Sequence, residues 1–169
     1  MLRSGFITPK TPKKGYETAL NDSAMKPILN REELKNAFRE RSRTKDWAYL
    51  SCGIRFFEQF EQIYGPVASE TILAFTAHLL SDVVDEIGLP DDVIGDLGKD
   101  GFAIITKIAL ADSVVTCLKT RFSAEILEHY SQVDRDRGYI IARDKIGKEL
   151  KVPLMRLAVG KISAADRFG

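Results

Sequence analysis

The sequence predicts an α/β fold in which a central sheet containing an antiparallel hairpin is flanked by helices, with an extra β-hairpin towards the C-terminus. Three observations lead to this fold class: two long amphipathic helical patterns, short apolar runs of strand type, and glycine-containing turns that separate neighbouring runs. The 169 residues, 44% of them hydrophobic, are enough for one domain with its own core.

Charge and terminal composition exclude several classes of protein. The chain has 25 basic and 24 acidic residues, so its net charge of +1 gives no overall bias towards nucleic acid or an anionic membrane. Residues 1–26 predict a flexible linker, because basic residues stand there among Gly, Ser, Thr and Pro without an aromatic or arginine cluster. No run resembles a signal peptide or reaches the ~18–20 uncharged residues that cross a bilayer. We therefore expect a cytoplasmic protein without nucleic-acid or membrane partners.

The first elements follow the linker in the order helix, strand, helix. Asn30 is a plausible cap for a helix over about 30–43, because acids occupy the first turn and apolar residues follow at helical spacing. Residues 47–54 are apolar, aromatic and too short for an independent helix, which favours a buried strand. Aromatic and aliphatic residues over 56–64 recur at steps of three and four, and Gly65 ends that short helix.

Two long helices carry the strongest periodicity. The first spans about 67–87, with Pro66 near its first turn and Gly88 just past its end. The second spans about 112–130, with Asp112 as its expected cap. Their apolar stripes are Ala68, Ile72, Phe75, Leu79, Val83 and Ile87 in the first helix, and Val115, Leu118, Phe122, Ile126 and Tyr130 in the second.

Two β-hairpins are predicted around polar turns. Residues 92–97 and 102–106 flank the glycine-rich turn 98–101, and we expect both strands in the central sheet beside 47–54. After a turn at 134–138, strands are expected over 138–143 and 150–159, joined around 144–148. Pro153 limits ladder pairing, so 138–152 should project beyond the compact sheet while 154–160 joins it.

Several short motifs share the order and spacing of a known family. They are Leu29-Asn30-Arg31, Phe57, Tyr64-Gly65, the hairpin Gly98-Lys99-Asp100-Gly101-Phe102, and the segment Met155 to Gly160. Together they resemble the GGDEF domain family of the diguanylate cyclase superfamily, whose central sheet is related to that of nucleotide cyclases. The resemblance implies a degenerate GGDEF-like domain over 27–169, from which the family's terminal helix is missing.

The resemblance implies that catalysis would need two Mg²⁺ ions held by carboxylates on neighbouring strands. The two strand aspartates of the family are matched here by Gly53 and Arg55, which flank Ile54. A glycine offers no side-chain ligand, and the cation of Arg55 would repel a metal by an energy of order a kcal/mol or more at short range. We expect no bound cofactor; Mg²⁺ would be needed only if residual activity remains.

The hairpin motif also departs from the family. Asp100, between Gly98 and Phe102, matches the remaining metal carboxylate and is the one candidate ligand. Lys99 replaces a glycine that lets the backbone approach the substrate; its side chain either crowds the pocket or touches a phosphate. Gly101 removes the family's glutamate, so the hairpin can still turn but presents less chemistry.

Some of the residues that the family uses for base recognition and product inhibition are also replaced. The family's guanine-binding Asn and Asp are matched by Glu61 and Glu70, on either side of Gly65. Glu61 cannot donate to a base carbonyl, and both glutamates could equally be solvated helix residues. In the family's inhibitory Arg-x-x-Asp motif, Asp92 remains while Leu89 replaces the arginine that would form the bidentate contact.

Two functional hypotheses follow from this resemblance. The favoured one is a catalytically inactive GGDEF-like signalling or interaction module in a bacterial pathway of the cyclic di-GMP type. Such a module would bind a protein partner or associate with itself as a homodimer. Its input would come from an upstream receiver or sensor domain. The alternative is a diguanylate cyclase with residual activity or GTP binding, using Asp100, the Ile54 carbonyl, Glu70 and Lys99.

Overall fold

The central sheet has five strands in the order β2-β4-β5-β3-β8. The structure is a computed structural model that describes residues 25–163, apart from the side chain of Asp100. All neighbouring strands are antiparallel except β2 and β4, which pair in parallel. The strands are β2 (Ile28–Leu29), β3 (Trp47–Arg55), β4 (Val93–Asp96), β5 (Phe102–Lys107) and β8 (Arg156–Ser163).

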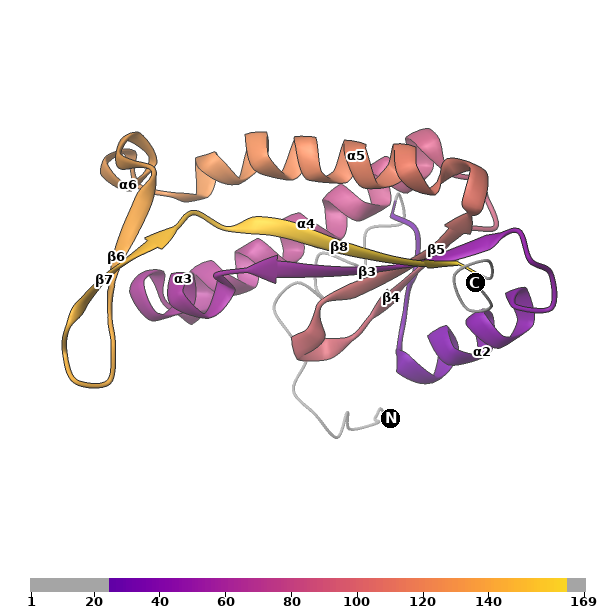
Figure 1. Ribbon diagram of the computed structural model, residues 1–169, viewed down its shortest axis with the longest axis horizontal. Helices are drawn as coiled ribbons and strands as arrows, with labels where there is room; N and C mark the ends of the chain where they lie inside the picture. The colour runs from indigo at the N-terminus through magenta and orange to yellow at the C-terminus, as the bar shows by residue number, and fades with distance from the viewer. Residues whose placement is uncertain (1–24, 164–169) are drawn as a thin grey trace, which may run out of the picture.

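Helices cover the two faces of this sheet unequally (Figure 1). The long helices α4 (Pro66–Ile87) and α5 (Ile108–Glu125) pack together on one face and form the main core with the sheet. The shorter α2 (Arg31–Arg41) lies on the opposite face, where a second core cluster forms around Leu34, Ala37, Ala103 and Ile105. This arrangement confirms the predicted sheet with its two long helices, and leaves part of the α2 face of the sheet open.

The helix α2 begins where its sequence predicts. The Asn30 side chain accepts a hydrogen bond from the Glu33 amide, and the Glu33 carboxylate accepts one from the Asn30 amide, both at 2.9 Å. This reciprocal capping box satisfies two donors that a helix start would otherwise leave unpaired.

The helix α4 is the central core helix. Its buried residues include Ile72, Leu79, Leu80 and Val83, which pack against the sheet and α5. By length and composition alone α4 could cross a membrane, but half of its most apolar window is buried in the fold, as in a core helix of a globular domain. Within the core, burial raises the pKa of the Cys52 thiol to about 12, and both Cys52 and Cys117 are free thiols.

The second long helix starts one turn earlier than predicted. It begins at Ile108, directly after β5, and Lys107 precedes it without a side-chain cap. Asp112 is therefore not the cap; its side chain is 87% exposed and pairs with Lys161 at 2.9 Å. The helix α5 ends at Glu125, and the remaining predicted turn is the 3-10 helix η2 (Ile126–His129).

The C-terminal hairpin projects beyond the end of the sheet, as predicted (Figure 1). Its strands β6 (Tyr139–Arg143) and β7 (Glu149–Pro153) form a separate two-stranded sheet. The expected strand over 150–159 is thus two strands, because β7 ends at Pro153 and β8 joins the central sheet after a break at 154–155.

The expected turn at 134–138 is wrong, because most of these residues belong to a short helix. Residues Gln132–Arg137 form the short helix α6, which Ser131 caps through a hydrogen bond from the Asp134 amide at 3.2 Å. Gly138 ends the helix in the left-handed region, with φ of 83°. The Tyr64 hydroxyl donates to the Asp134 carboxylate at 2.5 Å, which ties α6 to the helix α3 (Phe57–Tyr64).

Candidate functional site

The predicted site residues meet where β3 ends and the central hairpin turns. The hairpin consists of β4, the 3-10 turn η1 (Gly98–Asp100) and β5. Its turn is closed by the Leu97 amide, which donates to the Gly101 carbonyl at 2.8 Å. Because Cys52 of β3 pairs with Phe102 of β5, the turn lies beside Gly53. The structure thus brings the strand positions and the hairpin motif together.

Gly101 fits this place because it has no side chain. Its φ is +99°, and a Cβ atom built on it would lie closer than 3.0 Å to the Cys52 carbonyl oxygen and 3.2 Å from the Gly53 Cα. These neighbours are backbone atoms of the central strand, which cannot swing away as a flexible side chain can. The hairpin conformation observed here is therefore incompatible with the glutamate that the family carries at this position.

Two arginines face each other at the end of β3. Arg55 of β3 pairs with Arg156 of the edge strand β8, and both side chains are exposed. The guanidinium carbons lie 5.3 Å and 5.8 Å from the ring centroid of the same residue, Phe56. Phe56 has φ of 67° and is the only residue other than glycine with positive φ in the described part of the chain. Such backbone strain often accompanies functional sites.

A strip of small residues continues from these arginines along the sheet. Gly53 pairs with Ala158, and Ser51 pairs with Gly160. Because side chains alternate along a strand, these positions share the face of Arg55 and Arg156, which is also the face that α2 covers further along. We call Ser51, Gly53, Ala158 and Gly160 the small-residue strip.

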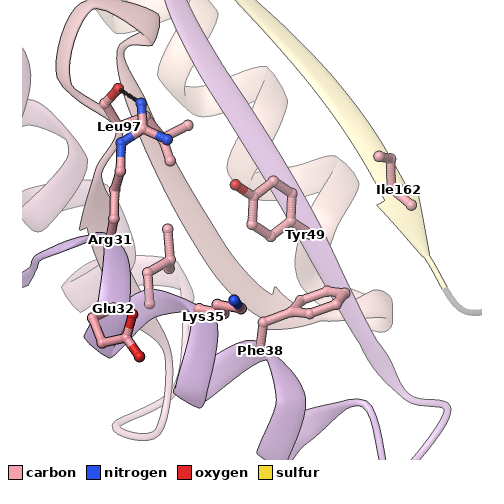
Figure 2. Close-up of a pocket in the computed structure, with 8 residues that line it drawn as sticks. Arg31, Glu32, Lys35, Phe38, Tyr49, Leu97 and Ile162 are labelled. Carbon is pink, nitrogen blue, oxygen red and sulfur yellow. Dashed lines mark hydrogen bonds between the residues drawn. The ribbon is translucent and has the colours of Figure 1, made fainter.

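Beyond the strip lies a pocket that the sequence did not predict (Figure 2). Its volume is about 500 Å³, and it opens between α2, β3 and β8. Phe38 and Tyr49 line it at 5.6 Å between ring centroids, and burial raises the pKa of the Tyr49 hydroxyl. Arg31 reaches over the pocket and donates to the Leu97 carbonyl at 2.5 Å, which connects α2 to the base of the hairpin turn.

The remaining hairpin positions lie in and beside the turn η1. Lys99 is exposed in η1, and its role in crowding the pocket or touching a phosphate stays a prediction. Asp100 has its backbone in η1, but its side chain lies outside the described part of the structure, and its role as a metal ligand stays a prediction. Gly98 adopts φ of 67°, and its amide donates to the Asp96 carboxylate at 2.7 Å. Phe102 is buried in the core at the start of β5.

The guanine-binding positions lie around the junction of α3 and α4. Glu61 accepts a hydrogen bond from the buried Ser69 hydroxyl at 2.5 Å, so its carboxylate helps to hold the first turn of α4. Gly65 joins the helices with φ of 92°. Glu70 is exposed on α4. Of the two glutamates, Glu61 therefore has a structural partner that the sequence did not reveal.

Asp92, the remnant of the inhibitory motif, faces the protein interior. It is 2% exposed, and one carboxylate oxygen accepts from the Thr106 hydroxyl at 2.7 Å and the Leu89 amide at 3.1 Å. The other oxygen is buried without a partner among the described residues. The carboxylate thus holds the loop after α4 against β5 and is not presented to a ligand.

The donor set near the hairpin is poor in metal ligands. In residues 25–163, leaving aside the side chain of Asp100, no group of three or more His, Cys, Asp or Glu side chains is placed to hold a metal ion. Mg²⁺ prefers carboxylate and other hard oxygen ligands, whereas β3 supplies a glycine and an arginine at its end. The described residues at this place do not fit a magnesium site.

Comparison with solved structures identifies the architecture. A GGEEF domain of a diguanylate cyclase from Vibrio cholerae, described as active, superposes with a TM-score of 0.55 at 17% identity over 82% of this chain and 80% of that one. The GGDEF domain of DgcB from Caulobacter crescentus, solved with c-di-GMP, gives a TM-score of 0.54 at 11% identity over 95% of this chain and 80% of that one. This chain has the fold of a GGDEF domain.

Diguanylate cyclase SiaD from Pseudomonas aeruginosa, solved with its activator SiaC, shares the GGDEF fold with a TM-score of 0.51 at 17% identity, over 86% of this chain and 52% of that one. No family model and no curated protein sequence matches the chain. At these identities the similarity establishes the fold, and the activity must be inferred from the site.

Proposed function

We propose that this chain is a non-catalytic GGDEF-type signalling module that does not convert GTP to cyclic di-GMP. The observation that carries the proposal is the end of β3, where Gly53 stands at the position of the family's metal-binding strand aspartate and the cation Arg55 lies two residues further along. A metal that neutralises the transferring phosphate contributes several kcal/mol to the transition state, and each 1.4 kcal/mol is about tenfold in rate. Without that metal, turnover falls to background.

The hairpin supports the same proposal. Gly101 packs against the Cys52 carbonyl, so the missing glutamate is replaced by a backbone contact that holds the turn in its present conformation. Glu61 is engaged by Ser69 and cannot donate to guanine. Asp92 is buried, and Leu89 offers no guanidinium, so product inhibition at the Arg-x-x-Asp position is also lost.

The direct test is product analysis. The purified chain is incubated with GTP and Mg²⁺ or Mn²⁺, and nucleotides are separated by chromatography, with the Vibrio cholerae GGEEF domain as positive control. We expect no cyclic di-GMP from this chain, nor from the variant Gly53→Asp, because the hairpin and guanine contacts remain altered. Cyclic di-GMP that accumulates in proportion to protein would overturn the proposal and make Asp100 a catalytic metal ligand.

Such a module would act through protein contacts in the cytoplasm. The complex of SiaD with SiaC shows that one structure with this fold has a protein activator. By analogy we propose a protein partner or a second copy of this chain for the present module, with an upstream receiver or sensor domain as its input. Light scattering across a concentration series tests self-association: a mass that stays monomeric up to the highest soluble concentration would exclude the homodimer.

A further inference from the structure

The strand β8 leaves one edge of the central sheet open. It is the last strand in the sheet order and pairs with β3 over its eight residues, from Arg156 to Ser163. In Figure 1 no helix or strand lies in front of β8. Such a strand makes an edge about 26 Å long, whose outward amides and carbonyls have no strand partner among the described residues. An edge of this kind is a template for pairing with another chain.

The middle of this edge lacks the features that usually prevent pairing. Protected edges are very short, or carry a proline, a bulge or an uncompensated charge. From Leu157 to Ser163 there is no proline, and the register with β3 advances one residue at a time without a bulge. The one charged side chain in this stretch, Lys161, is paired with Asp112 of α5 at 2.9 Å. The sequence of β8 therefore favours an edge that another strand covers.

The helix α5 lies over β8 and runs antiparallel to it (Figure 1). Its direction follows from the sheet, because β5 and β8 both pair antiparallel with β3, and α5 reverses the chain after β5. A second copy that paired with β8 would therefore bring its own α5 alongside this one.

One polar face of α5 lies on the open side of the sheet. Asp112 reaches Lys161 of β8, whereas Arg121, half a turn away around the helix, reaches Glu86 of α4. Lys119, two turns after Asp112, is exposed and makes no ion pair among the described residues. The exposed residues of this face recur at steps of four and three, and they are Asp112, Thr116, Lys119 and Ser123.

We propose that β8 pairs antiparallel with β8 of a second copy of this chain, about a two-fold axis near Val159 and Gly160. An axis perpendicular to the sheet keeps both α5 helices on one face and joins the two five-stranded sheets into one. Main-chain hydrogen bonds along β8 and contacts between the α5 helices form the interface. The proposal rests on the proposed function and deepens it, because it names the surface through which the signalling module associates with itself.

The charges on α5 agree with this symmetry. Lys161 is one or two residues, about 3–7 Å, from the axis along β8. That length corresponds to about two to four residues of helix beyond Asp112, so the axis passes α5 near 114–116. Asp112 of each copy then lies opposite 116–120 of the other, a stretch that contains Lys119. The interface thus holds two reciprocal pairs of opposite charge.

The charges on β8 also permit the pairing. With the axis at Val159 or Gly160, Lys161 lies opposite Leu157 or Val159 of the other copy, and never opposite a second lysine. The two Arg156 side chains lie at opposite ends of the new ladder. No like charges therefore face each other along the paired strands.

The test introduces charge at Gly160, beside the axis. A Cβ atom on Gly160 meets nothing within 4 Å, so Gly160→Lys and Gly160→Glu fit the single chain without a clash. In the dimer these two positions lie opposite or diagonally opposite, about 4.5–8 Å apart, where like charges repel. Sedimentation velocity over a concentration series should show a reversible dimer for the unmodified chain and at least about tenfold weaker association for each variant. An equimolar mixture of the two variants should restore the dimer, because opposite charges then meet.

Further measurements separate this interface from others. Lys119→Glu should weaken association about threefold to tenfold, because like charges then face each other across the axis, whereas Lys119→Arg should not weaken it. The matched controls are Val133→Lys and Val133→Glu, which add the same charges to an exposed position of α6 and should leave association unchanged. Amide hydrogen exchange in β8 should be slower in the dimer than in the Gly160 variants, while exchange in β5 stays the same.

Several results would overturn the proposal. A chain that stays monomeric at its highest soluble concentration would leave the edge of β8 to a strand of another protein. A dimer that persists in both Gly160 variants, or that Val133→Lys weakens equally, would have its interface elsewhere. Thermal melts check that each variant folds. If one unfolds, hydrogen exchange of the unmodified chain decides, because exchange in β8 must slow as the protein concentration rises.

These outcomes are distinct from failure of the proposed function. Cyclic di-GMP synthesis by the chain would defeat the proposed function and leave this dimer intact. A monomer would defeat the dimer and leave the proposed inactivity untouched.

Discussion

Replacing Gly101 by alanine should be among the most destabilising single changes in the hairpin. The residue has φ of 99°, and placing an L-residue in this region costs about 1–3 kcal/mol of backbone strain. The new Cβ would also overlap the Cys52 carbonyl, so β3 and the turn must separate. Separation breaks or stretches the last two hydrogen bonds of the ladder between β3 and β5, near Cys52 and Phe102, each worth about 1 kcal/mol. We expect a loss of about 3–5 kcal/mol.

The matched control is Gly65→Ala. Gly65 has φ of 92°, close to that of Gly101, but a Cβ atom there would meet nothing within 4 Å. Its replacement should therefore cost the strain alone, about 1–3 kcal/mol. Urea denaturation of both variants, followed by circular dichroism, gives the two free energies of unfolding. If Gly101→Ala lowers the free energy of unfolding no more than Gly65→Ala does, the turn does not pack closely on β3. The packing of Gly101 then no longer supports an inactive hairpin.

Three further predictions concern the fold around the site. In urea denaturation, Asp92→Ala should lower the free energy of unfolding by about 2–4 kcal/mol, because two donors lose a buried carboxylate. Thr106→Val should lower it by about 1 kcal/mol, because only one hydrogen bond is lost. Equal, negligible losses in both variants would mean that Asp92 is not a structural residue. Burial raises the pKa of Tyr130 to about 12, above the value near 10 of an unfolded chain, so its contribution to stability is complete below pH 10 and is lost as the pH rises from 10 to 12. Urea midpoints of Tyr130→Phe should fall less steeply over that range, and identical slopes would contradict the assignment. Amide hydrogen exchange should be fast at 144–148, in the exposed turn of the C-terminal hairpin, and slow in β5; protection of the turn comparable to that of β5 would argue against a projecting hairpin.

Local sequence patterns predicted the elements whose signals are local. The apolar stripe from Ala68 to Ile87 gave α4, and Asn30 with Glu33 marked the start of α2. The start of α5 was missed because Asp112 looks like a cap, whereas its side chain pairs with Lys161 from the far end of the chain. The cap of α6 was detectable, since Ser131 followed three residues later by Asp134 is a typical helix-start signal.

The site was harder to predict because its chemistry comes from pairing between distant segments. The sequence places Arg55 on β3, but only the strand register brings Arg156 opposite to it, 101 positions later in the chain. The tight packing of Gly101 likewise depends on how the turn lies against Cys52. The pocket beside Tyr49 needs α2, β3 and β8 together, so no single motif could reveal it.

The strand order has a consequence for how the protein folds. The longest ladder of the sheet joins β3 to β8, and it pairs Ala48 with Ser163 across most of the described chain. During synthesis, one edge of β3 stays unpaired until β8 has left the ribosome. Because β3 and β8 are far apart in the sequence, bringing them together costs loop-closure entropy before any contact forms, and this slows folding. Arg55 and Arg156 lie at the end of this ladder. Their like charges disfavour pairing between the open strand edges of two nascent chains, and so protect the unfinished sheet from aggregation.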